Sequence, residues 1–437
     1  MTEGGIAPWL KSSRWPTAPI RLVARLGSGH TPSRKVSEYW ENCTIPWVTL
    51  ADVWQLRSGG VDIISATKEK ISELGMANSS AALHPPGTVI LSRTASVGFS
   101  AMLGAAMATS QDFATWTCGH RVDPKFLLHV LRGMAPDLKR VSMGSTHKTI
   151  YMPDIEQLRT PLPPLEEQRR IADFLDAETS RIDKVASLRS LQRNLVKQRI
   201  DRRVADLAVG AEFATQPTGN VWVPYIHPGW QVVPLKRRWR IVDCKHRTPT
   251  YVETGYPVIS PGDISPGRLD LSRAHRFVDH EDYVDLADDL RRPRLGDIVY
   301  SRNASVGIAA YVDNDLPFTM GQDVCRITSD SESQLFLSYV LNTIALHELE
   351  SVQVGSTFSR VNISVLLELS IPYPPADVQE ELARKMDDVT LRGQDLLQLL
   401  DLQLGVLAER RQALITAAVT GQFDVTTASG RNTIQGV

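Results

Sequence analysis

The sequence lacks several patterns that mark common classes of protein. Its four cysteines, Cys43, Cys118, Cys244 and Cys325, lie far apart and form no Cys-x-x-Cys pair. This argues against a zinc knuckle or a redox motif and predicts free thiols in a reducing cytosol. No apolar run approaches the ~18 uncharged residues that a membrane span requires, and the first residues show no basic start followed by an apolar stretch. We therefore expect a soluble, cytoplasmic protein that does not interact with membranes.

Motifs that carry catalytic chemistry are also missing. The sequence has no Gly-x-x-x-x-Gly-Lys-Ser/Thr phosphate loop, no His-Glu-x-x-His and no Asn/Asp-Pro-Pro-Tyr/Phe segment of the kind that amino-methyltransferases use. Asp-x-Lys, a spacing found in metal-dependent nucleases, occurs at Asp123, Asp137 and Asp243, but none has an obvious second acidic ligand placed upstream after a strand. We predict a non-catalytic chain with no metal site and no cofactor of its own, and a free-standing nuclease remains the alternative.

The charge balance at first counts against nucleic-acid binding. There are 48 Lys and Arg residues against 49 Asp and Glu residues among the 437 residues, for a formal net charge of −1. Nucleic-acid-binding domains usually carry an excess of cations. A sum over the whole chain hides local fields, however, and a chain of this length is expected to fold as two or more domains.

An internal duplication divides the chain. Pro46 and Pro257 lie in matching segments about 211 residues apart, a period too long for a solenoid repeat. The collinear matching blocks are Ile45 to Val53 with Tyr256 to Ile264, Gly87 to Gly98 with Gly296 to Gly307, Gln111-Asp112 with Gln322-Asp323, Gly144-Ser145-Thr146 with Gly355-Ser356-Thr357, and Pro163-Pro164 with Pro374-Pro375. One domain fold is therefore used twice.

Each copy changes character at its proline pair. Before the pair, short β-branched and apolar runs are punctuated by Gly and Pro, as expected for strands of an α+β or mixed α/β domain. After it, apolar residues recur at spacings of three, four and seven, which predicts a long helix with a narrow apolar seam. The predicted segments are two globular domains (1–163 and 230–374), two helices (164–209 and 375–425), a linker (210–229) and a tail (426–437).

The two long helices are expected to pack against each other as an antiparallel coiled coil. The alternative is that each helix lies on its own domain, and Gly393 and Gly405 argue against one unbroken second helix. The predicted seam residues are Ile171, Leu175, Ile182, Val185, Leu188, Leu191 and Leu195 in the first helix, and Leu382, Met386, Val389, Leu396, Leu400, Leu404, Leu407, Leu414 and Ala418 in the second.

Both copies repeat polar and basic loop chemistry. Each has a strand-like run that ends in Ser-Arg before Ala-Ser-Val-Gly, where a small turn would aim the guanidinium outward, and each has Gly-Ser-Thr followed by a cation. Hydroxyls, backbone N–H groups and cations bind the sugar-phosphate backbone, and Arg can also bind guanine bidentately. The alternative is that Gly-Ser-Thr is a capping turn and Ser-Arg a surface strand end. The candidate DNA-binding residues are Ser92, Arg93, Ser96, Ser145, Thr146, His147, Lys148, Lys236, Arg237, Lys245, Arg247, Ser301, Arg302, Ser305, Ser356, Thr357 and Arg360.

These motifs, in this order, resemble the specificity (S, or HsdS) subunit of type I restriction-modification systems. The resemblance rests on Thr31-Pro32-Ser33-Arg34 with Tyr39-Trp40, on Ile45 to Thr49, on Gly-Ser-Thr, on Pro161 to Ala172 and on Arg411 to Val425. The second copy departs from the pattern, with Ala376-Asp377-Val378-Gln379 after its proline pair and no Ser-Arg-Tyr-Trp continuation after Thr248-Pro249. These departures concern the bases that this half reads.

The resemblance implies that each globular half is a target recognition domain that reads one part of a split site in double-stranded DNA. It also implies that the helices set the spacing and dock two modification subunits. Those partners would bind S-adenosylmethionine and methylate adenine, and restriction subunits would use ATP and Mg²⁺. A helix from Glu166 to Leu207 would span roughly 60 Å, enough for two major-groove segments at least one DNA turn apart. The alternative function is a coiled-coil scaffold that binds only proteins.

Overall fold

A computed structural model describes residues 10, 12–56, 60–142, 149–353 and 360–425. The chain forms two compact units, one of residues 1–190 and 401–437 and the other of residues 191–400. Each unit thus takes part of both long helices, a division that the predicted segments did not anticipate. In the described part of the chain, no helix is both long and apolar enough to cross a membrane.

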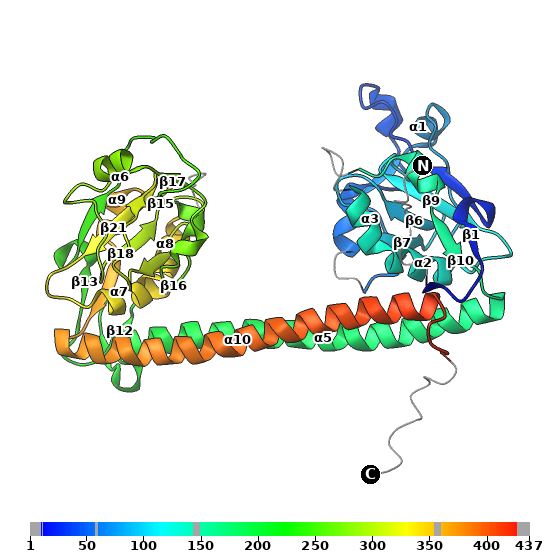
Figure 1. The fold of residues 1–437 in the computed structure, drawn as a ribbon. Helices are drawn as coiled ribbons and strands as arrows, with labels where there is room; N and C mark the ends of the chain where they lie inside the picture. Colours follow the sequence, from blue (N-terminus) through cyan, green and yellow to red (C-terminus); the bar gives the residue numbers. More distant parts are fainter. Residues whose placement is uncertain (1–9, 11, 57–59, 143–148, 354–359, 426–437) are drawn as a thin grey trace, which may run out of the picture. The chain divides into compact units, whose positions relative to one another are not determined.

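The first unit contains a mixed five-stranded sheet, a three-stranded sheet and a strand pair (Figure 1). Their strand orders are β2-β9-β6-β7-β4, β5-β3-β8 and β1-β10. The elements are β1 (Thr17–Pro19), β2 (Ala24–Ser28), β3 (Ile45–Val48), β4 (Ile63–Ile64), β5 (Glu69–Ile71), β6 (Val89–Ser92), β7 (Ser100–Leu103), β8 (Ala108–Thr109), β9 (Phe113–Cys118), β10 (Arg159–Pro161), α1 (Glu73–Ala77), α2 (Pro124–Gly133), α3 (Ala135–Ser142) and α4 (Met152–Glu156).

The second unit repeats this topology strand for strand, with orders β14-β21-β18-β19-β16, β17-β15-β20 and β13-β22. A further hairpin, β11-β12, lies in the segment expected to be a linker. The elements are β11 (Gln216–Pro217), β12 (Tyr225–Ile226), β13 (Gln231–Pro234), β14 (Arg240–Asp243), β15 (Tyr256–Ile259), β16 (Gly267–Arg268), β17 (Phe277–Val278), β18 (Ile298–Ser301), β19 (Ala309–Tyr311), β20 (Thr319–Met320), β21 (Val324–Thr328), β22 (Ser370–Tyr373), α6 (His280–Leu286), α7 (Gln334–Leu341), α8 (Ile344–Gln353) and α9 (Ile363–Leu367). The α+β duplication predicted from the sequence is confirmed.

The central strand of each large sheet is buried on both faces, which explains its continuous apolar sequence. Val89 and Leu91 of β6 face a core formed with α2, whereas Ile90 faces a second core on the other side of the sheet. In the second unit Ile298 and Tyr300 of β18 pack into one core, and Val299 packs into a second core on the other side of the sheet. The period-two alternation of side chains across a strand produces both cores.

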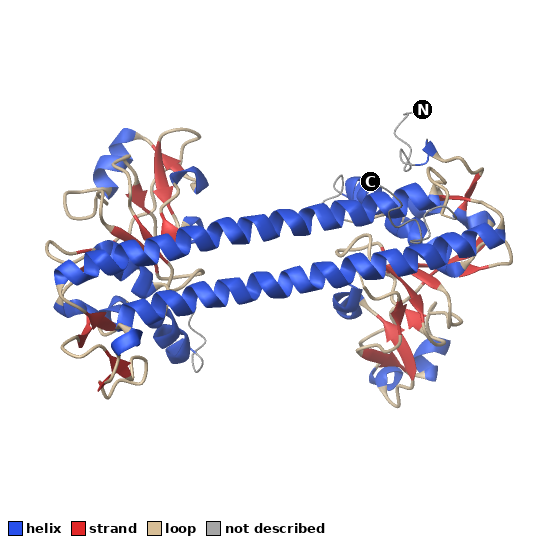
Figure 2. Cartoon of the chain, turned by 90° about the horizontal axis from the view of Figure 1, so that it is seen from below, coloured by secondary structure: helices blue, strands red, loops and turns tan. Residues whose placement is uncertain are grey.

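The two long helices are α5 (Leu165–Val209) and α10 (Ala376–Val419). Within each unit their segments lie side by side (Figures 1 and 2). In the first unit Arg411 of α10 pairs with Asp183 of α5, with 2.8 Å between Nε and Oδ1. In the second unit Gly393 allows close approach, because an added Cβ would lie 2.2 Å from Cδ1 of Ile200. The helix α10 continues through Gly393 and Gly405, so the expected interruption is absent.

The predicted seam is only partly correct. Near the helix ends, Ile171 and Leu175 are buried in the core of the first domain, and Leu382 and Met386 in the core of the second. Packing on the domains and contact between the helices therefore occur together. Of the remaining predicted seam residues, Ile182 and Leu400 are buried. Val389, Leu404, Leu407 and Leu414 are half-buried. Five predicted members are instead exposed, namely Val185, Leu188, Leu191, Leu195 and Leu396. In α5 the repeated spacing of three carries the series around the helix, so Leu188, Leu191 and Leu195 lie on a different face from Ile171 and Leu175.

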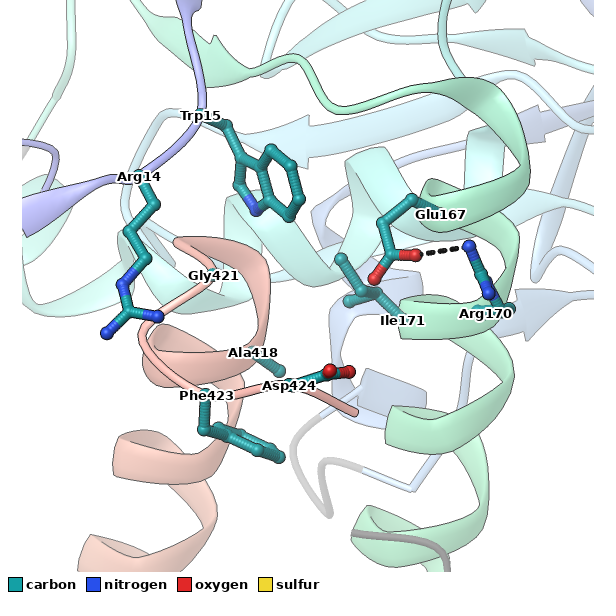
Figure 3. Close-up of a pocket in the computed structure, with 9 residues that line it drawn as sticks. All are labelled: Arg14, Trp15, Glu167, Arg170, Ile171, Ala418, Gly421, Phe423 and Asp424. Atoms are coloured by element: carbon teal, nitrogen blue, oxygen red, sulfur yellow. Dashed lines mark ion pairs between the residues drawn. The ribbon is translucent and has the colours of Figure 1, made fainter. Parts of the chain in front are cut away.

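The end of α10 packs on the N-terminal segment of the first unit. Gly421 has φ +69°, and an added Cβ would lie 2.4 Å from Nε1 of Trp15. The backbone N–H of Arg14 donates to the carbonyl of Thr420 at 2.9 Å. Figure 3 shows the ring of Trp15 between the end of α10 and the first turns of α5. The cavity there, about 460 Å³, is lined by both acids and arginines, with Glu167 paired to Arg170 at 2.6 Å.

The second unit has the same junction at the end of α5. Gly210, directly after the helix, has φ +64°, and an added Cβ would lie 3.1 Å from the ring of Trp230. The backbone N–H of His227 donates to the carbonyl of Val209 at 2.9 Å. Both long helices therefore end on a glycine and tryptophan contact, because only glycine adopts this left-handed conformation at little cost beside a bulky ring.

Candidate nucleic-acid interface

The repeated Ala-Ser-Val-Gly turn has the same geometry in both domains. It joins β6 to β7 in the first and β18 to β19 in the second. Ala95 and Ala304 both have φ +56°, whereas Gly98 and Gly307 have φ +94° and +90°. A left-handed alanine is strained, because its Cβ crowds the backbone. Strain retained at equivalent positions in both copies points to a required loop shape.

Segments distant in sequence hold this turn in place. In the first domain the N–H of Arg93 donates to the carbonyl of Asp112 at 2.9 Å, and the carbonyl of Arg93 accepts from the N–H of Ile150 at 2.8 Å. In the second domain the N–H of Arg302 donates to Asp323 at 2.8 Å, and its carbonyl accepts from Val361 at 2.8 Å. The turn therefore lies between the repeated Gln-Asp segment and the residues that follow Gly-Ser-Thr.

The Thr-Pro segment joins the same cluster. The Thr31 hydroxyl donates to Oε1 of Gln111 at 2.6 Å, and Nε2 of Gln322 donates to the Thr248 hydroxyl at 2.9 Å. Four repeated segments thus meet at one place in each domain. Gln111, Gln322, Thr31 and Thr248 were not among the candidate residues, although the duplicated blocks included Gln111 and Gln322.

In the second domain this cluster borders an open cavity of about 400 Å³. Its polar lining includes hydroxyl and amide groups, which can both donate and accept hydrogen bonds. Groups of this kind match the edges of bases. The lining residues are Thr248, Tyr251, Ser260, Pro261, Gly262, Arg276, Asn303, Ala304, Gln322 and Asp323.

The Ser-Arg pairs are less accessible than predicted. Ser92 and Ser301 are fully buried, and the Ser301 hydroxyl donates to the carbonyl of Asn303 at 2.9 Å. The Arg302 side chain is only 4% exposed, and its Nη2 lies 2.5 Å from Oδ1 of Asp243. The prediction of an outward guanidinium is therefore wrong for Arg302, because a carboxylate at the end of β14, which lies beyond β21 in the same sheet, holds it inside the domain.

Arg93 differs from Arg302, because its side chain is half-buried and its Nη1 lies 3.4 Å from the carbonyl of Ile150. Ser96 and Ser305 are half-buried on the turn itself. Arg360 is exposed, and its Nε lies 2.7 Å from Oδ1 of Asp323 beside the cavity. These four candidates lie at the cluster formed by the repeated segments.

Two further candidate cations are ion-paired with α6. Lys245 pairs with Asp285, and Arg247 pairs with both Asp282 and Asp285. The ammonium of Lys245 and then the guanidinium of Arg247 hold the pKa of Asp285 below its ordinary value. Their charge is therefore largely compensated within the domain, which the run of basic residues in the sequence did not reveal.

The last described candidates lie away from the repeated cluster. Lys236 and Arg237 are exposed in a short 3-10 helix (Leu235–Arg237), where Lys236 pairs with Glu368 next to α9. The structure does not bring these two residues into the cavity lining. Six other candidates, Ser145, Thr146, His147, Lys148, Ser356 and Thr357, lie outside the described residues.

The Asp-x-Lys positions have structural roles. Asp123 caps α2 by accepting from the N–H groups of Lys125 and Phe126 at 2.9 and 3.2 Å, and Asp137 lies within α3. Asp243 belongs to a cluster with Cys244 and His246 whose potential ligand atoms lie within 4.8 Å of one another. The adjacent Arg302 guanidinium already compensates Asp243 and disfavours a cation there. All four cysteines are free thiols, as predicted.

Comparison with known proteins agrees with the duplication. A family model for the type I restriction modification DNA specificity domain matches residues 13–191 and 234–400. The type I restriction enzyme MjaIX specificity subunit of Methanocaldococcus jannaschii is 29% identical over 163 residues, which cover 37% of this chain and 37% of that protein. The MjaVIII specificity subunit of the same organism is 23% identical over 313 residues, covering 70% of this chain and 71% of that protein.

A solved structure has a similar fold. That structure concerns the complex assembly and conformational transition of the type I R-M system. It aligns with a TM-score of 0.66 at 20% identity and covers 94% of this chain and 98% of that one.

Proposed function

This chain belongs to the type I restriction modification DNA specificity domain family, and we propose that it is the subunit that selects the DNA sequence for such a complex. Each domain reads one part of a bipartite site in double-stranded DNA. The observation that carries the proposal is the repeated turn, with Ala95 and Ala304 at the same φ of +56° between equivalent segments. One recognition surface used twice suits a site made of two half-sites.

Protein partners would bind the long helices. In the first unit Val185 and Leu188 of α5 and Leu402 and Val406 of α10 are 44 to 64% exposed. In the second unit the positions displaced by 211 residues, Leu396, Leu399, Leu191 and Leu195, are 40 to 55% exposed. Exposed apolar side chains at regular spacing mark protein interaction surfaces. Equivalent sets in the two units suit two copies of one partner, the modification subunit.

The chemistry would reside in those partners. The modification subunits would bind S-adenosylmethionine and methylate adenine, and restriction subunits would bind ATP and Mg²⁺, translocate DNA and cut it. This chain would supply recognition and spacing in the cytoplasm, without a cofactor of its own. Cysteines held as free thiols suit that compartment.

Mapping methylated bases in the genome of cells that express the chain with its modification subunit tests this function. We expect one bipartite motif that disappears when this chain is deleted. A methylation pattern that does not depend on this chain would overturn the proposal. If DNA binding by the reconstituted complex shows no dependence on salt concentration, the scaffold alternative is favoured instead, because phosphate contacts release counterions.

A further inference from the structure

Arg276 occupies a position in the second domain that a glutamate holds in the first. In the first domain Trp47 of β3 pairs with Glu69 of β5. The duplication aligns Trp47 with Val258, and the N–H of Val258 donates to the carbonyl of Arg276 at 2.9 Å. Equivalent positions next to the same strand therefore carry opposite charges.

The neighbours of these two residues differ as well. In the first domain Glu69 pairs with Arg34, with 2.8 Å between Oε2 and Nη2, and the Arg34 guanidinium lies 4.5 Å from the ring centroid of Trp40. Arg34 follows Thr31 by three residues, as Tyr251 follows Thr248. A tyrosine therefore takes the place of the paired arginine in the second domain.

Tyr251 supports the Arg276 guanidinium without neutralising it. The guanidinium carbon lies 5.1 Å from the ring centroid of Tyr251, and Nη1 lies 3.3 Å from the hydroxyl oxygen. Among the described residues, no carboxylate forms an ion pair with Arg276. The first domain thus has a compensated pair where the second presents an uncompensated cation stacked on an aromatic ring.

Both Arg276 and Tyr251 line the cavity beside the repeated turn. The carboxylate of Asp323 in the same lining is already bound by Nε of Arg360 at 2.7 Å and by Nδ2 of Asn303 at 3.0 Å. Arg276 is exposed, so its planar guanidinium is free to meet a ligand. A ring-supported guanidinium is suited to planar, bidentate recognition, for which lysine is a poor substitute.

We propose that Arg276 is a specificity-determining residue that binds the O6 and N7 edge of a guanine in the half-site read by the second domain. This inference rests on the proposed function. Guanine is the base whose major-groove edge offers two acceptors to an arginine. Glu69 at the equivalent position excludes the same contact in the first domain, so the duplicated domains read different bases from one scaffold.

The test uses the full chain assembled with its modification subunit on duplexes in which each half-site is randomised. We expect Arg276→Ala and Arg276→Lys to lose a guanine preference of roughly 5- to 150-fold at one position. The other half-site should be unchanged. The control is Arg273→Ala, which removes an exposed arginine of the same domain outside the cavity lining. Thermal melting of each variant separates loss of contact from loss of fold.

Two results would overturn the inference. A uniform loss of affinity across all sequences, with a lower salt dependence in Arg276→Ala and near-normal binding by Arg276→Lys, would identify a phosphate contact instead. Unchanged specificity in both folded variants would show that Arg276 contacts no base. Failure of the proposed function is distinguishable, because the wild-type complex would then show no bipartite preference at all.

Discussion

The imidazole of His129 contacts the carboxylate of Asp176, with 2.8 Å between Nε2 and Oδ1. His129 belongs to α2 and is fully buried, whereas Asp176 lies on α5. The second unit has the same relationship between Tyr339 of α7 and Asp387 of α10, with 2.7 Å between the hydroxyl and Oδ1. In each unit a polar contact at an equivalent position therefore joins a long helix to its domain.

The Asp176 contact predicts acid-sensitive stability. Burial alone would raise the pKa of this carboxyl, but hydrogen bonds from His129 and Lys125 outweigh burial and lower the pKa from 3.8 to about 2. A depressed pKa in the folded state stabilises the fold above about pH 4, and this contribution disappears as the pH falls toward 2. We expect Asp176→Asn to flatten this part of a curve of unfolding free energy against pH.

At neutral pH, Asp176→Ala should lower the unfolding free energy by about 1–3 kcal/mol, because the buried imidazole loses its partner. Urea denaturation at several pH values measures both effects. The matched control is Asp173→Asn, one turn earlier on α5, whose side chain is 77% exposed. Equal acid sensitivity of the wild type and Asp176→Asn would contradict the prediction.

The two Ser-Arg arginines should behave differently when replaced. Arg302→Ala removes the guanidinium that compensates the Asp243 carboxylate, so we expect a loss of about 1–3 kcal/mol in unfolding free energy. Arg93→Ala should instead weaken DNA binding, by roughly 1–3 kcal/mol within one half-site if Arg93 contacts a base edge. Urea denaturation and binding to half-site variants give the two readouts. A fully stable Arg302→Ala that lost only DNA binding would contradict the structural role.

Two glycines of α10 form a matched pair for testing helix contact. Gly393→Ala would place a methyl group 2.2 Å from Cδ1 of Ile200, so we expect destabilisation of about 1–3 kcal/mol despite the higher helix propensity of alanine. At Gly405 no atom lies within 4 Å of an added Cβ, so Gly405→Ala should stabilise the chain by up to about 1 kcal/mol. Ile200→Ala combined with Gly393→Ala should recover part of the loss. Equal melting temperatures for the two single variants would argue against this helix contact.

Replacing either left-handed alanine with glycine should affect both the stability of its domain and the discrimination of bases by that domain. Ala304→Gly relieves the strain at φ +56°, so its unfolding free energy should be unchanged or up to about 1 kcal/mol higher. The freed turn should discriminate bases less well, but only in the half-site of the second domain. Ala95→Gly is the reciprocal control for the first domain. Unchanged discrimination in both variants would show that the turn conformation is not needed for recognition.

Much of the architecture could be read from local pattern. The duplication, the strand runs and the two long helices follow from residue spacing, because each pattern reports which faces of one element are apolar. The pattern does not show, however, whether an apolar residue of a helix is buried against a domain, packed on the other helix or left exposed. Ile171 and Val185 are 14 residues apart and lie on one face of the helix, yet Ile171 is buried against its domain and Val185 is 44% exposed.

By itself, therefore, the sequence determined that one α+β domain occurs twice and that two helices follow the two copies. Only the tertiary structure decided which polar residues are available to a ligand. Arg302 is enclosed by Asp243, which lies 59 residues away in the chain, while Arg276 remains uncompensated beside Tyr251. Whether a charge is neutralised depends on groups that folding brings within a few ångströms, and residue spacing along the chain does not encode that distance.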